Sequence, residues 1–265
     1  MTSPPVRVAV LATIAALLLA ACGADDGPTA TASTQGAGSG DVIVSAAASL
    51  KKALTGYGER FDGGEVRLSF AGSDELAAQI RQGIKPDLFA AANTKLPDQL
   101  FEEGLVEQPV TFATNELVLA VPADADVVAG LDDLAKGGTT IAIGAEGVPV
   151  GDYTRTVLER LPAAQSKAIL ENVRSNEPDV GGIVGKLTQG AVDAGFVYRS
   201  DVEGAGGKLK AIELPDDLKP TVEYGVAIVK GAKNPEGAKA FLDGLIDGAG
   251  AQALRDAGFG PPPRT

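Results

Sequence analysis

The sequence predicts an α/β fold of two lobes, each a mainly parallel sheet flanked by helices, with two hinge crossings between them. From residue 41 onward, short apolar runs alternate with amphipathic stretches, and this alternation is typical of parallel βαβ units. The pattern occurs in two blocks, which are separated near residues 120 and 222. Hydrophobic residues make up 45% of the chain, which is enough for a sizeable core.

The N-terminus carries a processing signal before this folded region. Arg7 precedes an apolar run over residues 8–21 that is too short to span a bilayer comfortably, so we expect residues 1–21 to be a signal peptide. The run ends in Leu-Ala-Ala before Cys22, the single cysteine, which resembles the lipobox of bacterial lipoproteins and implies a lipid on the Cys22 sulfur. An ordinary signal peptide followed by an unrelated cysteine is the alternative. Residues 22–40 are rich in small and polar residues and predict a flexible tether.

Lobe 1 begins with the first block. Short apolar runs predict strands, and apolar residues three or four apart predict helices. The expected strands are residues 42–44, 66–70, 88–91 and 116–121, and the expected helices are residues 50–61, 74–82 and 96–103. Pro122 ends the last strand, since proline has no N–H for a sheet. We assign residues 41–121 and 223–265 to lobe 1.

The second block, residues 122–222, predicts lobe 2. Residues 131–135 begin the repeated pattern. The expected strands are residues 140–143, 172–175, 194–198 and 209–214, and the expected helices are residues 153–161 and 180–188. A long apolar strand over residues 222–229 then leads back to lobe 1, where residues 235–246 and 249–257 predict two final helices.

Composition argues against several classes of function. The net charge of −12 disfavours nucleic acid as a partner, because phosphate backbones bind basic surfaces. The chain has no histidine, which removes the usual general base, the commonest metal ligand and any Ser-His-Asp site. One cysteine leaves no disulfide and no Cys metal site. We therefore predict no catalytic residue, although an enzyme with a carboxylate pair and a Mg²⁺ site stay open as alternatives.

Uncharged hydrogen-bond donors lie where expected strands lead into expected helices. Ser49 and Ser73 each precede a helix, Tyr198 ends a buried strand, and the turn at 148–151 precedes a helix whose first N–H groups are free. Such groups can bind a small oxyanion without formal positive charge. As alternatives, the two serines are plain helix caps, and the Tyr198 hydroxyl has a structural partner.

Five segments support the oxyanion interpretation. They are AAASL at 46–50, FAGSDELAAQI at 70–80, IKPDLFAAAN at 84–93, VPVGDYTR at 148–155 and GFVYRSDV at 195–202. With them, residues 41–259 resemble the periplasmic molybdate-binding proteins of ABC importers, which have the two-lobed type II periplasmic binding protein fold. The resemblance implies that the oxyanion is bound by the hydroxyl or backbone N–H groups of five residues: Ser49, Ser73, Val150, Val180 and Tyr198. The metal would be held through the oxygens of molybdate, not by direct coordination.

The resemblance also implies the protein's setting. We expect a monomer anchored by lipid on Cys22 to the outer face of the cytoplasmic membrane, without a cofactor, that delivers molybdate or tungstate to the permease subunits of an ABC importer. A sulfate- or phosphate-binding protein is the first alternative, and Asp74 or Asp152 would then accept the phosphate proton. A lipid-anchored enzyme is the second. Because both lobes supply donors, we expect ligand-driven closure about crossings at 120–123 and 221–225.

Overall fold

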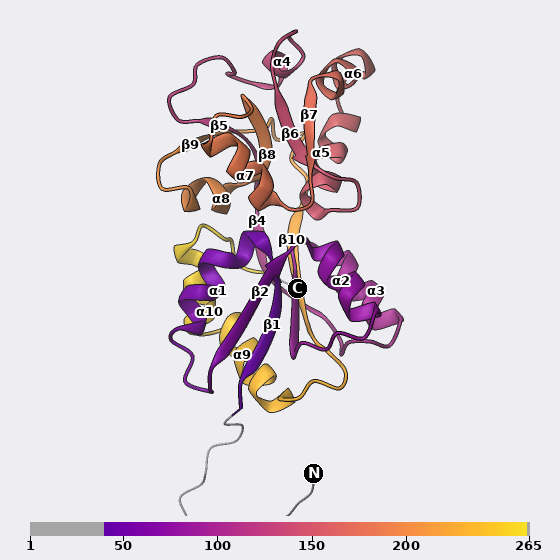
Figure 1. The fold of residues 1–265 in the computed structure, drawn as a ribbon, viewed down its shortest axis with the longest axis vertical. Coiled ribbons are helices and arrows are strands. Elements are labelled where there is room, and N and C mark those ends of the chain that lie inside the picture. Colours follow the sequence, from indigo (N-terminus) through magenta and orange to yellow (C-terminus); the bar gives the residue numbers. More distant parts are fainter. Residues whose placement is uncertain (1–39, 264–265) are drawn as a thin grey trace, which may run out of the picture. The chain divides into compact units, whose positions relative to one another are not determined.

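The computed structural model describes residues 40–263. The expected signal peptide, Cys22 and the tether up to residue 39 lie outside the described residues. Two five-stranded mixed sheets flanked by helices form the two lobes (Figure 1), which confirms the expected two-lobed α/β class. Within residues 40–263, no helix is both long and apolar enough to cross a membrane.

Lobe 1 contains the sheet with strand order β2-β1-β3-β10-β4. Its strands are β1 (Val42–Ala47), β2 (Val66–Ala71), β3 (Leu88–Ala91), β4 (Val110–Asn115) and β10 (Val222–Ile228), and its helices are η1 (Ala48–Leu50), α1 (Lys51–Gly58), α2 (Ser73–Arg81), α3 (Lys95–Glu102), α9 (Pro235–Ile246) and α10 (Ala249–Asp256). β1 pairs in parallel with β2 and β3, whereas β10 is antiparallel to β3 and β4. Only β10 therefore runs against the other strands.

Lobe 2 repeats this arrangement in the order β7-β6-β8-β5-β9. Its strands are β5 (Leu117–Pro122), β6 (Ile141–Gly144), β7 (Val173–Glu177), β8 (Ala194–Tyr198) and β9 (Leu209–Ile212), and its helices are α4 (Leu131–Leu134), α5 (Pro149–Glu159), α6 (Ala163–Glu171), α7 (Val180–Thr188) and α8 (Arg199–Gly204). Here β5 is the reversed strand, antiparallel to β8 and β9. In each lobe the reversed strand is therefore one that begins where the chain passes between the sheets.

The chain changes sheets earlier than the sequence predicts. It leaves the first sheet after Asn115 and enters the second at Leu117, because β5 pairs with β8 and β9 and not with a strand of lobe 1. The expected strand at 116–121 thus belongs to lobe 2. Its residues Leu117 to Val121 are all buried, so their pattern suits either sheet. The sequence reading also missed β4 and α6.

Local sequence explains where several helices begin. Pro149 occupies the first turn of α5, where its missing N–H has no intrahelical partner to lose. The side chain of Asp179 caps α7 by accepting a hydrogen bond from the Gly182 N–H at 3.1 Å. Asn234 caps α9 in the same way. These caps fix the starts of helices that flank both sheets.

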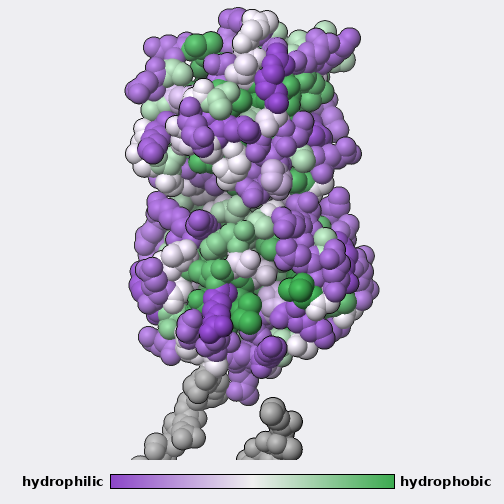
Figure 2. All heavy atoms as spheres, viewed as in Figure 1, coloured by the Kyte–Doolittle hydropathy of each residue, from purple (hydrophilic) through white to green (hydrophobic). Residues whose placement is uncertain are grey.

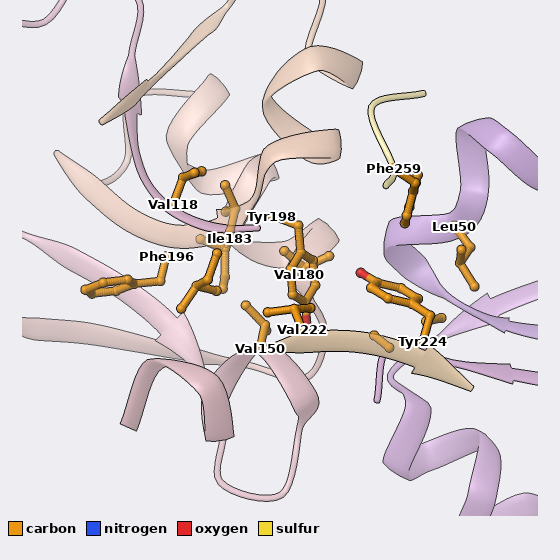
Figure 3. Close-up of a cluster of buried hydrophobic side chains, with 14 of the residues drawn as sticks. Leu50, Val118, Val150, Val180, Ile183, Phe196, Tyr198, Val222, Tyr224 and Phe259 are labelled. Carbon is orange, nitrogen blue, oxygen red and sulfur yellow. The ribbon is translucent and has the colours of Figure 1, made fainter. Parts of the chain in front are cut away.

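One large hydrophobic cluster contains residues of both lobes. Tyr198 of β8, Tyr224 of β10 and Phe259 after α10 lie close together within it (Figure 3). The Tyr224 ring centroid is 5.8 Å from that of Tyr198 and 5.3 Å from that of Phe259, in edge-to-face geometry. The lobes therefore share aromatic packing. On the outside, hydrophilic residues cover most of the visible face of both lobes (Figure 2), consistent with the strongly acidic composition.

Candidate functional site

The structure brings all five predicted site residues together around one cavity between the lobes. The cavity has a volume of about 20 Å³, which is far smaller than the roughly 300–1,000 Å³ of typical pockets for organic ligands. Its lining residues are Ala47, Ala48, Ser49, Ala71, Gly72, Ser73, Ala92, Val148, Pro149, Val150, Asp179, Val180 and Tyr198. The size suits a small inorganic ion.

Helix starts from both lobes meet at this cavity. Lobe 1 supplies the start of η1, which continues into α1, and the start of α2; lobe 2 supplies the starts of α5 and α7. Val150 is the second residue of α5 and Val180 is the first of α7, so their backbone N–H groups have no partner within their own helix. Free N–H groups and helix dipoles both favour an anion at this point.

Ser49 lies inside η1 and does not cap a helix. Neither η1 nor α1 has a side-chain cap. The Ser49 side chain is buried, and its Oγ lies 2.9 Å from Tyr224 Oη. The interpretation of Ser49 as a plain cap is therefore wrong.

Ser73 is the first residue of α2, and its side chain does not cap that helix either. It is 1% exposed. Its Oγ accepts a hydrogen bond from the Ala92 backbone N–H at 3.0 Å. Because an N–H group can only donate, the proton of the Ser73 hydroxyl stays available for an acceptor in the cavity.

The hydroxyl oxygen of Tyr198 gives the strongest indication of a ligand in the cavity. The residue is 1% exposed, and nothing within residues 40–263 forms a hydrogen bond with its Oη. Burial raises the pKa of Tyr198 well above its usual value, so the hydroxyl stays protonated. A buried hydroxyl without a partner costs about 1–3 kcal/mol. An acceptor bound in the cavity would remove this cost.

The cavity offers an anion no formal positive charge from the described residues. Its lining contains neither Lys nor Arg, and its one carboxylate is Asp179, the cap of α7. Asp74 and Asp152, which the phosphate alternative requires, are not among the lining residues. Asp152 Oδ1 accepts a hydrogen bond from the Gly147 N–H at 2.9 Å. An anion bound in this cavity would therefore be held by neutral hydrogen-bond donors.

Comparison with known proteins places the chain among transport proteins. The family model described as bacterial extracellular solute-binding protein matches residues 42–260. The chain belongs to this family. Its members are extracytoplasmic solute-binding proteins of ABC transporters and not enzymes.

Individual known proteins are similar over most of the chain. The molybdate-binding protein ModA of Mycobacterium tuberculosis is 34% identical over 251 residues, which cover 92% of this chain and 93% of the relative. A putative ABC transporter substrate-binding lipoprotein, YvgL of Bacillus subtilis, is 27% identical over 261 residues, covering 94% and 96%. The structure of the periplasmic molybdate-binding protein of Azotobacter vinelandii superposes with a TM-score of 0.76 at 23% identity, covering 84% of this chain and all of that one.

The two lobes of this solute-binding protein approach closely beside the cavity. A Cβ atom added at Gly72 of lobe 1 would lie 2.4 Å from the carbonyl oxygen of Pro178 in lobe 2 and 2.8 Å from Asp74 Oδ1. Only glycine fits this approach. Asp74 Oδ1 is itself buried and has no hydrogen-bond partner within residues 40–263. Burial raises the pKa of Asp74, and the nearby charges of Glu75 and Asp152 raise it further.

Sequence reasoning missed the polar groups behind the cavity. Asn115, at the end of β4, donates a hydrogen bond from Nδ2 to Ser200 Oγ of lobe 2 at 2.8 Å. Tyr224 contacts Ser49 from β10. Tyr224 lies in a long apolar run that predicts only a core strand, so the sequence offers no signal for its contact with the site. The cap residue Asp179 could have been recognised from its place just before a helix.

Proposed function

We propose that this protein captures molybdate in the cavity between its lobes and delivers it to the permease of an ABC importer. The hydroxyls of Ser49, Ser73 and Tyr198 and the backbone N–H groups of Val150 and Val180 would donate hydrogen bonds to the four oxygens. No side chain would coordinate the metal directly. Tungstate has nearly the same size and charge, so it would bind in the same way.

The hydroxyl of Tyr198, which has no hydrogen-bond partner within residues 40–263, is the observation that carries this proposal. It is a protonated, buried donor on the wall of a small cavity that also contains two serine hydroxyls. Removing a dianion from water is costly unless donors replace the water. Hydrogen bonds to a charged acceptor contribute about 1.5–3 kcal/mol each, so five or more of them can offset much of that cost. The name of the Mycobacterium tuberculosis relative supports molybdate as the ion.

Size would separate molybdate from sulfate. The donors sit on strand ends and helix starts of two packed lobes, so they cannot follow a smaller ion without moving the backbone. Sulfate has shorter bonds to oxygen than molybdate, and its hydrogen bonds would be stretched at one lobe or the other. A stretched hydrogen bond weakens steeply.

Melting experiments with different oxyanions test the assignment. We expect molybdate and tungstate, each at about a thousand times the dissociation constant, to stabilise the protein by about 4 kcal/mol. Sulfate and phosphate at the same concentrations should shift the melting temperature much less. Equal shifts for sulfate and molybdate would contradict the assignment of the ion, and a shift with phosphate alone would favour the phosphate alternative.

Membrane attachment through Cys22 completes the proposal. The lipobox-like sequence before Cys22 predicts diacylglycerol on the Cys22 sulfur. The Bacillus subtilis relative, whose match covers 94% of this chain, is named as a lipoprotein. Lipid on Cys22 and a tether up to residue 40 would keep the binding lobes beside the importer at the outer face of the cytoplasmic membrane. We further propose that the protein acts as a monomer.

Ligand binding would also close the lobes. Ser49 and Ser73 belong to lobe 1, whereas Val150, Val180 and Tyr198 belong to lobe 2, so neither lobe alone can replace the ion's water. Closure would bend the chain at residue 116 and within residues 213–221. Small-angle scattering should show a smaller radius of gyration with molybdate than without it. An unchanged radius in a sample that binds molybdate would argue for a preformed site.

A further inference from the structure

Ser49 and Tyr224 form a buried hydrogen bond directly behind the cavity. Ser49 Oγ and Tyr224 Oη are 2.9 Å apart, and either atom could be the donor. Ser49 lines the cavity, whereas Tyr224 is not among the lining residues. The direction of this one hydrogen bond decides what the cavity meets: the proton of Ser49 or only its lone pairs.

The partners of Tyr224 indicate the direction. Within residues 40–263, Ser49 Oγ is the one hydrogen-bond partner of Tyr224 Oη, and Tyr224 is fully buried. If Ser49 donated to Tyr224, the Tyr224 proton would have no acceptor in the described part of the chain, and a buried donor without an acceptor destabilises the fold. Tyr224 donating to Ser49 avoids this.

Ser73 has an equivalent arrangement on the neighbouring helix. Its Oγ accepts from the Ala92 N–H, a group that cannot accept in return. Each cavity serine thus has a protein donor behind it. Tyr224 would donate a hydrogen bond to Ser49 Oγ, as the Ala92 N–H does to Ser73 Oγ.

Packing holds the Tyr224 hydroxyl in place. The Tyr224 ring makes edge-to-face contacts with Phe112, Phe259 and Tyr198, at centroid distances of 6.2, 5.3 and 5.8 Å. Figure 3 shows its hydroxyl pointing from the lobe 1 side toward Val180 and Tyr198 of lobe 2. Burial, then the charge of Asp201, raises the pKa of Tyr224 well above its usual value, while the hydrogen bond with Ser49 lowers it. Tyr224 therefore keeps the proton that it donates.

We propose that Tyr224 is a positioning residue for oxyanion binding: it donates to Ser49 Oγ and so turns the Ser49 proton toward the bound ion. The hydrogen bond from Tyr224 to Ser49 and the one from Ser49 to the ion then run in the same direction, and hydrogen bonds in such a series polarise one another and strengthen the final donor. Because Tyr224 lies near the start of β10, this series also joins one of the two crossings between the lobes to the site. This inference rests on the proposed function.

A double-mutant cycle tests it. Molybdate affinity is measured by calorimetry for the parent, Tyr224→Phe, Ser49→Ala and the double variant. We expect Tyr224→Phe to weaken binding about three- to tenfold, the effect of one ordinary hydrogen bond. In the Ser49→Ala background the same change should have less than about a twofold effect, because it acts only through Ser49. Tyr57→Phe is the matched control: Tyr57 is buried in lobe 1 and donates to the Phe241 carbonyl at 3.1 Å, so its loss should leave affinity unchanged.

The outcomes separate the inference from the function. If the parent binds molybdate and Tyr224→Phe weakens binding equally in both backgrounds, or not at all, Tyr224 does not orient Ser49. If the parent binds no oxyanion, the proposed function fails and this inference fails with it. Should Tyr224→Phe not fold, Phe112→Leu, which removes a ring that packs against Tyr224, takes its place in the cycle. Its effect on affinity should likewise disappear in the Ser49→Ala background, and an effect that persists there would overturn the inference.

Discussion

Replacing Tyr198 with phenylalanine should separate binding from stability. The change removes one hydroxyl and leaves the ring, which packs against Tyr224 at 5.8 Å and Tyr153 at 6.4 Å between centroids. In the structure this hydroxyl has no hydrogen-bond partner within residues 40–263, so phenylalanine breaks no contact of the protein itself.

The expected changes in molybdate affinity and in the free energy of unfolding have different physical causes. With ligand, Tyr198→Phe loses one hydrogen bond to a charged acceptor, about 1.5–3 kcal/mol, or roughly a ten- to hundredfold weaker affinity. Without ligand, removing a buried hydroxyl that lacks a partner should leave the free energy of unfolding unchanged or raise it by up to about 1–3 kcal/mol. Most changes to a buried residue lower stability. Weaker binding together with unchanged or higher stability would therefore distinguish Tyr198 from an ordinary core residue.

Titration calorimetry with molybdate and urea denaturation without it measure the two quantities on the same samples. Tyr57→Phe serves as the opposite control, because it breaks a hydrogen bond within the protein and should lower stability while keeping affinity. Parent-like affinity in Tyr198→Phe, together with a loss of stability, would refute the reasoning and return the Tyr198 hydroxyl to a structural role.

Three further predictions use the same assays. Ser73→Ala should weaken molybdate binding roughly tenfold and lower the free energy of unfolding by about 1–3 kcal/mol, because it also leaves the buried Ala92 N–H without its acceptor; unchanged affinity by calorimetry would remove Ser73 from the site. Burial raises the pKa of Asp74 in the folded protein, so folding favours its protonated state: the contribution of Asp74 to the free energy of unfolding should be largest below the usual Asp pKa of about 3.9 and be lost as the pH rises through the raised pKa. Asp74→Asn should lose this contribution, and an identical pH profile in the variant would contradict it. Cys22→Ser should release a soluble protein that still binds molybdate, and a variant that stays with the membrane on fractionation would show that lipid on Cys22 is not the anchor.

The sequence predicts the lobes well because hydrophobic periodicity is local. Strands such as β3 and helices such as α7 follow from apolar runs and their spacing. The sheet to which a strand belongs is not local information. The run Leu117 to Val121 is apolar at every position, and only its pairing with β8 and β9 places it in lobe 2.

In the candidate site, too, some residues can be recognised from the local sequence and others cannot. Ser49, Ser73 and Tyr198 stand at strand ends and helix starts, which the sequence reveals, and the structure places them around one cavity. Tyr224 reaches Ser49 from 175 residues further along the chain. Its hydroxyl lies in an apolar strand, so nothing in the local pattern distinguishes it from a core tyrosine.

The order of strands in lobe 1 has a consequence for how the protein matures. β10 lies between β3 and β4, although it follows both by more than a hundred residues, and all of lobe 2 comes between. During synthesis the N-terminus of the chain emerges first. β4 therefore emerges long before β10, the strand that joins β4 to the sheet. Lobe 2, which is continuous in sequence, can fold first. Lobe 1 can close its sheet only when residues 222–228 have emerged, and the Ser49–Tyr224 hydrogen bond forms in that same late step. A binding-competent site is thus a sign that the polypeptide has been synthesised and released almost to its end.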